Sequence, residues 1–190
     1  MYLLTETASP FALERWAAFF ANFGQFAKGF FYTLGISIGA LIVALLLGLI
    51  FGPMSSTHNK VLRGISRVYV EIFQNTPLLV QFVVVFYGIS ILTDGHIMIP
   101  ISLTAILCVG VYTGAYISEI IRTGIEAVPK GQTEAALSQG FTYADTMRII
   151  ILPQAVRTIL PPLTNQVVNL IKNTSTVAII SGADIMFTAK

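Results

Sequence analysis

Residues 29–52 read GFFYTLGISIGALIVALLLGLIFG, an apolar stretch without a single charged side chain. A helix needs about 20 apolar residues to cross the hydrocarbon core of a bilayer, so this stretch predicts a membrane-spanning helix. Further apolar segments predict spans at about residues 69–92, 99–121 and 147–171. Backbone polar groups in lipid must be paired internally, and four strands could not close a barrel, so the spans must be helices. We therefore predict one all-α domain over residues 1–190, a polytopic membrane helix bundle.

The composition of the chain agrees with a protein of the bilayer. Of 190 residues, 55% are hydrophobic and only 11% are charged, whereas soluble domains carry about 25% charged residues. The one cysteine, Cys108, lies within an apolar run, so neither a disulfide framework nor a cysteine metal site is expected. No HExxH or other metal-ligand pattern occurs. The net charge of +2 gives no reason to expect a nucleic acid partner.

The basic residues predict how the helices cross the membrane, because loops rich in Lys and Arg stay in the cytoplasm. The connection after the first predicted span carries Lys60, Arg63 and Arg67, whereas the connection after the second has neither Lys nor Arg. The connection after the third span, residues 122–146, carries Arg122 and Lys130, and Arg148 follows it. We therefore expect the N-terminus outside the cell, and the first and third connections in the cytoplasm.

Within the spans, small residues are spaced for close helix packing. Three pairs of glycines lie one helical turn apart, namely Gly35/Gly39, Gly48/Gly52 and Gly110/Gly114. At the cytoplasmic end of the third span, Glu119, Arg122 and Glu126 are spaced for a local ion-pair ladder, and we favour this structural role for Glu119.

The third connection contains a pattern that a simple helix linker would not need. Residues 134–153 read EAALSQGFTYADTMRIIILP and fit E-A-A-x3-G-x9-I-x-L-P in full. The fixed positions are Glu134, Ala135, Ala136, Gly140, Ile150, Leu152 and Pro153. The stretch resembles the signature loop of the membrane-spanning subunits of ABC importers.

Other segments resemble the permeases of the polar amino acid uptake family, the histidine, glutamine and arginine-type importers. These segments are QNTPLLVQ (74–81), GAYISEIIRTGIEAVPKGQTEAA (114–136) and KNTS (172–175). The family often has RGTP where Gln74 and Asn75 stand here, so a positive charge is missing. Such permeases usually have a fifth core helix after the KNTS segment. We therefore expect at least four spans here and an incompletely represented subunit.

The resemblance implies a permease subunit that forms a translocation pathway as a homodimer or with a similar sister chain. It also implies cytoplasmic ABC ATPase subunits, an extracellular or periplasmic solute-binding protein, an amino acid substrate, and a multi-pass location in the lipid of the bacterial plasma (inner) membrane. The chain contains no G-x-x-x-x-G-K-S/T phosphate loop. ATP and Mg²⁺ would therefore be bound by the partner ATPase, and this chain would need no cofactor and catalyse no reaction.

The signature loop itself is expected to fold as helix, tight turn and helix. Ala135 and Ala136 are good helix formers with so little bulk that a partner surface can approach closely. Gly140 can take a left-handed conformation that ends the first helix, and Thr142 followed by Asp145 predicts the start of the second.

Charge and proline complete the expected contact with the ATPase. Glu134 and Arg148 offer charge pairing to a partner, and Pro153 breaks the helical hydrogen-bond pattern where the fourth span begins. The residues assigned to ATPase coupling are Glu134, Ala135, Ala136, Gly140, Arg148 and Pro153. The alternative is an ordinary cytoplasmic connector between two helices.

Polar side chains within the spans are candidates for the substrate pathway, because such groups are costly in lipid and normally face a bundle interior or a water-filled path. Asn and Gln amides can bond both the ammonium and the carboxylate group of an amino acid. The assigned pathway residues are Gln74, Asn75, Gln81, Tyr116, Asn165, Asn169, Lys172 and Asn173. They could instead bond neighbouring helices, and Lys172 could simply reach the headgroups. Pro77 can kink the second span, which suits either a moving gate or static packing.

Two other classes of function remain open from the sequence. The stretch GISIG at Gly35–Gly39 matches the G-x-S-x-G turn of serine hydrolases, with Ser37 as nucleophile. However, His58 and His96 fall on opposite sides of the membrane in the predicted topology, so an intramembrane protease is a remote reading. A secondary transporter or channel would also need polar stripes, but it leaves the signature loop unexplained, and no inverted repeat is evident.

Overall fold

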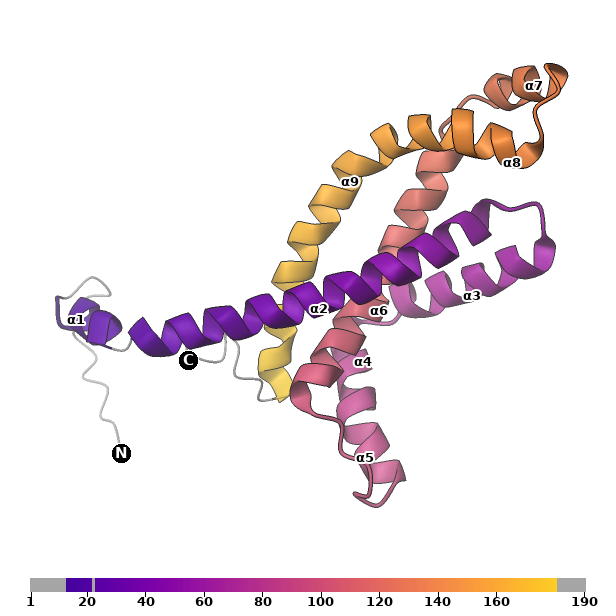
Figure 1. Ribbon diagram of the computed structural model, residues 1–190. Helices are drawn as coiled ribbons and strands as arrows, with labels where there is room; N and C mark the ends of the chain where they lie inside the picture. Colours follow the sequence, from indigo (N-terminus) through magenta and orange to yellow (C-terminus); the bar gives the residue numbers. More distant parts are fainter. Residues whose placement is uncertain (1–12, 22, 181–190) are drawn as a thin grey trace.

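The computed structural model describes residues 13–21 and 23–180, and these residues form helices with no strand among them. The helices that set the architecture are α1 (Leu13–Ala21), α2 (Phe23–Ser56), α3 (Lys60–Asn75), α4 (Leu78–Val83), α5 (Ile89–Leu92), α6 (Ile101–Glu126), α7 (Lys130–Ser138), α8 (Tyr143–Asp145) and α9 (Leu152–Asn173). Wider π-helical turns η1 (Val84–Gly88) and η2 (Thr146–Ile151) join α4 to α5 and α8 to α9, and a 3₁₀ helix η3 (Thr174–Ile180) follows α9. The predicted all-α class is confirmed (Figure 1).

Helices α2 and α6 form the centre of the bundle. Each is long and apolar enough to cross a membrane alone, and more than half of the most apolar window of α6, 56%, is buried inside the chain, against 28% for α2. Helix α6 is therefore the central helix of the bundle, and both α2 and α9 pack against it. The predicted external N-terminus falls on residues outside the described part of the chain.

Glycines allow α2 and α6 to approach closely, as their spacing predicts. A Cβ atom at Gly48 would lie 2.3 Å from Cγ2 of Ile117, and one at Gly110 would lie 3.1 Å from the carbonyl oxygen of Ala40. Similar close contacts surround Gly39, Gly52 and Gly114. Gly35 is the exception, because a Cβ atom there would meet nothing within 4 Å. Five of the six predicted glycines therefore pack against the facing helix.

The second predicted span, residues 69–92, is not one helix. It is broken between α3 and α4, and the two parts meet at an angle of 97°. Pro77 accounts for the break, because its ring disfavours helical geometry in the preceding residue and it has no N–H to donate. Thr76 is accordingly extended, with φ −97° and ψ 122°. The bent pair makes a third possible membrane crossing if it acts as one span.

The basic residues after the first span lie on a helix, not in the loop where the sequence analysis placed them. Helix α3 begins at Lys60 because the side chain of Asn59 caps it, accepting hydrogen bonds from the backbone N–H groups of Val61 (2.9 Å) and Leu62 (3.3 Å). The connection between α2 and α3 is therefore only a few residues long, and α3 folds back along α2 (Figure 1).

Helix α9 covers most of the fourth predicted span, residues 147–171. It is more polar than α2 and α6, and it contains Pro161 and Pro162. Its contact with α6 is nevertheless close, since a Cβ atom at Gly124 would lie 2.3 Å from Cγ1 of Ile159. That α9 crosses the membrane stays a prediction.

Candidate functional site

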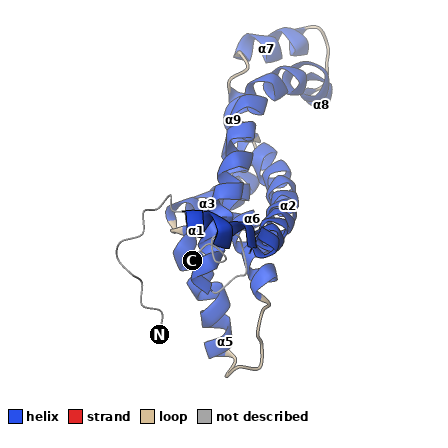
Figure 2. Cartoon of the chain, turned by 90° about the vertical axis from the view of Figure 1, so that its left-hand side faces the viewer, coloured by secondary structure: helices blue, strands red, loops and turns tan. Residues whose placement is uncertain are grey.

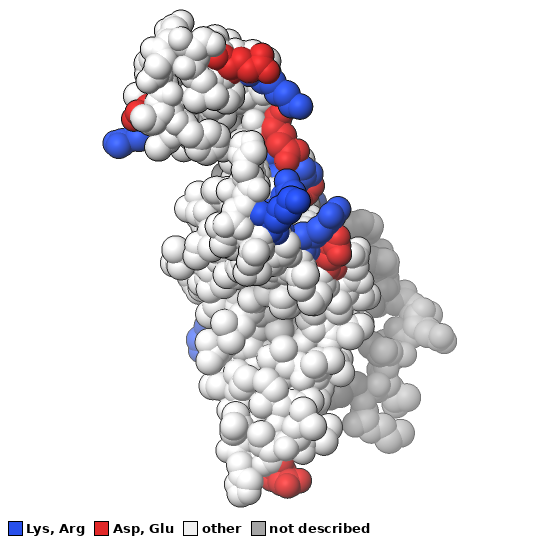
Figure 3. All heavy atoms as spheres, turned by 90° about the vertical axis from the view of Figure 1, so that its right-hand side faces the viewer, with Lys and Arg blue, Asp and Glu red and all other residues white. Residues whose placement is uncertain are grey.

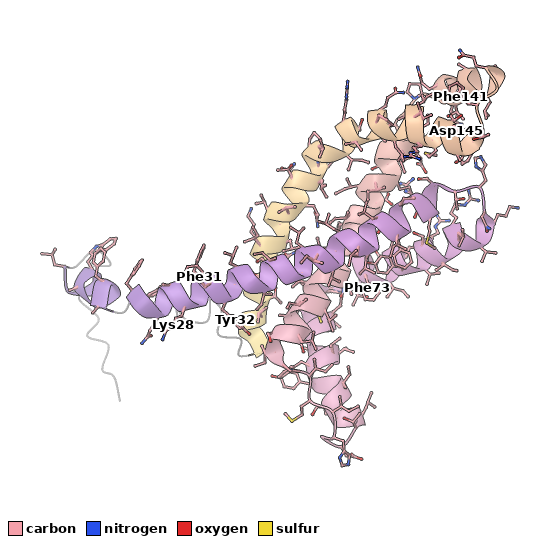
Figure 4. The ribbon with its side chains drawn as sticks, in the orientation of Figure 1. Lys28, Phe31, Tyr32, Phe73, Phe141 and Asp145 are labelled. Atoms are coloured by element: carbon pink, nitrogen blue, oxygen red, sulfur yellow. The ribbon has the colours of Figure 1, made fainter. Side chains whose placement is uncertain are left out.

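Residues 130–151 form the helical hairpin that the signature pattern predicts, and they are called the coupling hairpin below. Helix α7 ends in a paired backbone turn, with the Phe141 N–H donating to the Ala136 carbonyl (3.1 Å) and the Gly140 N–H donating to Leu137 (3.0 Å). This turn needs a left-handed residue, and Gly140 supplies it with φ +88°. Phe141 and Asp145 lie on the hairpin (Figure 4).

A side-chain cap starts the second arm of the coupling hairpin, as predicted. The Thr142 hydroxyl oxygen accepts from the Asp145 N–H at 3.2 Å and donates to the Asp145 carboxylate. The helix then continues through η2 into α9 without a break. Pro153 thus stands at the start of α9 after a widened turn, where a missing N–H is tolerated. The hydrogen-bond pattern changes from π-helical to α-helical next to Pro153, although the chain stays helical.

The exposed surface of the coupling hairpin carries most of the residues assigned to ATPase coupling. Glu134, Ala135, Gly140 and Arg148 are exposed, and within the described residues neither Glu134 nor Arg148 takes part in an ion pair. Ala136 is different, because it is 3% exposed. The small side chain of Ala135 can therefore let a partner approach closely, whereas Ala136 packs within the hairpin.

The coupling hairpin lies at the same end of the molecule as the corner between α2 and α3. The rings of His58 and Tyr143 meet edge to face with centroids 5.7 Å apart, and the two elements enclose an open cavity of about 740 Å³ that also involves Arg63 and Glu134. Seen from the side, α7 and α8 project at this end and α5 at the other (Figure 2). The charged residues visible in Figure 3 gather largely at the hairpin end and along the ridge next to it.

A second feature is an open pocket of about 280 Å³ between α6 and α9, called the polar pocket below. Its lining residues are Tyr112, Tyr116, Gln166, Asn169, Lys172 and Asn173. The two tyrosine hydroxyls lie 3.1 Å apart, and Lys172 is the one charged residue of the lining. Four of the assigned pathway residues thus come together here. Gln166, which the assignment missed, was signalled only by its place beside Asn165 in the polar stripe of α9.

The other four assigned pathway residues lie outside the polar pocket. Gln74 donates to the Ala115 carbonyl of α6 at 3.2 Å and lines a separate cleft of about 420 Å³. Asn75 is exposed at the end of α3, and Asn165 is exposed on another face of α9 from the pocket residues. Gln81 is buried, and its amide donates to two backbone carbonyls.

The cleft beside Gln74 contains two groups of ion pairs. Arg122 donates to Glu119 through two nitrogens and to Glu126, so the predicted ladder on α6 is present. Across the cleft, Arg67 of α3 pairs with Glu71 at 3.0 Å. Both groups are local pairs between residues three or four apart on a helix, which supports the structural reading of Glu119.

The described residues are arranged neither as a serine hydrolase site nor as a metal site. The Ser37 hydroxyl donates to the Thr33 carbonyl of its own helix at 2.8 Å and is buried in α2, whereas the ring of His58 lies against Tyr143 at the hairpin end. Ser37 is therefore not arranged as a nucleophile. Within residues 13–21 and 23–180, no group of three His, Cys, Asp or Glu side chains could hold a metal ion.

A membrane helix bundle with a capped helical hairpin at its charged end is the arrangement that the signature pattern predicts for an ABC transporter permease. The chain belongs to the family of binding-protein-dependent transport system inner membrane components, which it matches over residues 44–189. This family consists of non-catalytic membrane subunits. The predicted location in the bacterial inner membrane is confirmed.

Individual relatives narrow the resemblance to amino acid permeases. The chain is 41% identical over 173 residues to the probable glutamine ABC transporter permease protein GlnM of Bacillus subtilis (strain 168), covering 90% of this chain and 77% of the relative. It is 36% identical over 171 residues to the glutamate/aspartate import permease protein GltJ of Escherichia coli (strain K12), covering 85% and 70%. The resemblance to polar amino acid permeases is thereby confirmed.

Solved structures agree with this assignment. A chain in the crystal structure of an amino acid ABC transporter with histidines superimposes with a TM-score of 0.83 at 34% identity, over 91% of this chain and 79% of that one. An inward-facing structure of the MetNI methionine ABC transporter gives a TM-score of 0.71 at 18% identity, over 86% and 78%. The second comparison supports the fold alone.

Proposed function

We propose that this chain is the permease subunit of an ATP-driven importer of polar amino acids, and that the coupling hairpin is its contact with a separate cytoplasmic ATPase. The hairpin is the observation that carries the proposal. Its α7 arm and its turn are closed by local hydrogen bonds, it projects from the charged end of the bundle, and it leaves Glu134 and Arg148 without an ion-pair partner among the described residues.

The pathway would be formed by two permease subunits, either identical or similar, with a solute-binding protein delivering the amino acid from outside. ATP binding would close the ATPase subunits, draw the two coupling hairpins together and open the pathway outward, and hydrolysis would reset it. Helix α6 leads directly into α7 through three residues, Ala127 to Pro129, so a displacement of the hairpin would be passed to the central helix.

The polar pocket is the candidate contact for the solute. Lys172 can pair with a carboxylate, while the amides of Gln166, Asn169 and Asn173 can both donate and accept. The names of the relatives cited above include glutamine and glutamate/aspartate, and the lining has no acidic residue that would favour a cationic side chain. We propose an amide or acidic amino acid as the solute.

The experiment that tests the coupling role compares two glycines with the same conformation. Gly140 and Gly95 both have positive φ, +88° and +78°, and a Cβ atom would meet nothing within 4 Å at either position. Valine at either position would therefore be strained by its backbone conformation, at a cost of roughly 1–3 kcal/mol. Gly140 lies in the coupling hairpin, whereas Gly95 lies in the connection between α5 and α6 at the other end.

The full-length subunit would be purified together with its co-expressed ATPase. Gly140→Val is expected to lose the ATPase and transport-linked ATP hydrolysis while still inserting into the membrane, and Gly95→Val is expected to retain the ATPase. Normal transport by Gly140→Val would refute the docking role. Folded wild-type subunit that never binds an ATPase would instead favour a channel or a secondary transporter.

A further inference from the structure

The break in the second span leaves backbone groups that an unbroken helix would pair. This break, at Thr76 and Pro77, is called the elbow below. Pro77 has no N–H, so the Phe73 carbonyl loses its usual donor four residues on. The Val80 N–H bonds to the Pro77 carbonyl at 2.9 Å instead of continuing the pattern of α3, which removes the usual donor from the Thr76 carbonyl.

The side chain of Gln81 supplies donors to these two carbonyls. Its amide nitrogen lies 3.1 Å from the Phe73 oxygen and 2.9 Å from the Thr76 oxygen. One primary amide nitrogen has two hydrogens, so it can serve both carbonyls. The Gln81 side chain reaches back from the first turn of α4 across the elbow and joins the end of α3 to the start of α4. Phe73 lies on the last turn of α3 (Figure 4).

The surroundings of Gln81 make these two bonds matter. Gln81 is 8% exposed, and Leu78 and Phe82 beside it are buried at 8% and 0% exposure. Phe73 and Thr76 are half-buried, and their bonds to Gln81 are partly buried. A backbone carbonyl left unpaired in such a place costs free energy, and more so in lipid. Without the Gln81 amide, the Phe73 and Thr76 carbonyls would lack these donors. The chain would then favour any other angle between α3 and α4 that gave the two carbonyls a donor.

Helix α3 has side-chain bonds of its own to the central helix. Tyr69 donates to the Val111 carbonyl at 2.8 Å and Gln74 to the Ala115 carbonyl at 3.2 Å. Helix α3 is thereby held to α6, so a change at the elbow would move α4 and α5 relative to α6. A straight second span would direct α4 and η1 away from their present contacts with α6.

We infer that Gln81 is a positioning residue that sets the elbow angle by donating the hydrogen bonds that Pro77 cannot make. Its amide replaces the backbone donor lost at Pro77 and holds the two halves of the span at a fixed angle. Gln81 does not line the polar pocket, so it acts on the pathway through the elbow and not by touching the solute. This role is independent of which solute is carried and of how the ATPase docks.

The test measures the elbow angle directly, with spin labels at Val68 of α3 and Ile91 of α5. Both side chains are exposed, at 58% and 73%, and buried Cys108 would be replaced by Ala in every variant. Gln81→Leu keeps the approximate size of the side chain and removes both donors. Gln154→Leu is the matched control, because the Gln154 amide bonds only to Ile150 of its own exposed helix surface.

Electron–electron distance measurements on the full-length chain, purified with its transport partners, should show one distance in the wild type and in Gln154→Leu. In Gln81→Leu, we expect the population at that distance to fall by about tenfold relative to other distances, since two partly buried acceptors lose their donor. Gln81→Asn should be intermediate, because its shorter amide cannot reach both carbonyls. An unchanged distance in a folded Gln81→Leu protein would overturn the inference.

A double-mutant cycle separates the donor role from simple packing. Pro77→Ala restores an N–H that can bond to the Phe73 carbonyl, so it should remove much of the effect of Gln81→Leu. If Gln81→Leu fails to insert, then restored insertion in the double variant supports the inference. Additive effects, or no recovery of insertion, would mean that Gln81 only fills space. The distance measurement needs no transport assay, so failure of the proposed function would not affect it.

Discussion

The contact between Gly48 of α2 and Ile117 of α6 allows a quantitative test of how the bundle is packed. Adding one methyl group in Gly48→Ala would place the new Cβ atom 2.3 Å from Cγ2 and 2.9 Å from Cβ of Ile117. Ile117 is 1% exposed and has no room to move aside. Overpacking of this kind costs about 1–3 kcal/mol. We therefore expect Gly48→Ala to lower the free energy of unfolding by that amount.

Gly35→Ala is the matched control, since Gly35 lies on the same helix and a Cβ atom there meets nothing within 4 Å. Any gain in helix propensity from Ala is common to both variants and cancels in the comparison. The assay is reversible unfolding of the purified full-length chain in mixed micelles. Equal free energies of unfolding for the two variants would refute the close α2–α6 packing.

A second substitution identifies the atom responsible. Ile117→Ala removes the methyl group at 2.3 Å and by itself should cost about 2–5 kcal/mol. Combined with Gly48→Ala, it should be at least about 1 kcal/mol less destabilising than the sum of the two single changes. Strict additivity would show that the cost of Gly48→Ala arises elsewhere.

Two further predictions concern the coupling hairpin and the polar pocket. Thr142→Ala removes the cap on the Asp145 N–H and should destabilise the second arm by about 1 kcal/mol, which would appear as faster amide hydrogen exchange in residues 143–146. Thr164→Ala is the control, because it loses only an exposed bond within α9 and should leave that exchange unchanged. Equal protection of residues 143–146 in the two variants would contradict the cap. Lys172→Met removes the one charge of the polar pocket and should raise KM for amino acid uptake into proteoliposomes by about tenfold, within the range for a lost charge-assisted hydrogen bond, with ATPase binding retained. Lys60→Met, outside that pocket, is its control, and unchanged uptake by Lys172→Met would mean that Lys172 only reaches the lipid headgroups.

Features that depend only on residues close together in the chain could be predicted before the fold was known. The apolar runs at residues 29–52 and 99–121 correspond to α2 and α6, because hydropathy over one helix length is a local property. The turn at Gly140 and the cap at Thr142 were predictable for the same reason, since each motif is closed by residues within a few positions. Glycine spacing likewise predicted the packing of α2 on α6, but it could not show that Gly35 faces open space.

Which side chains meet depends on how the helices pack against one another. Spacing along α9 put Asn165 in one stripe with Asn169, yet only Asn169 faces the tyrosines of α6, because one helix does not reveal where its neighbours lie. Pro77 predicted a possible kink, but the angle of 97° rests on Gln81 reaching back across the break. Ala136 looked equivalent to Ala135 and is buried by the fold of its own hairpin. Burial and direction are properties of the packed molecule, and the backbone groups left unpaired by a local break must be satisfied by whatever side chain the packing brings to them.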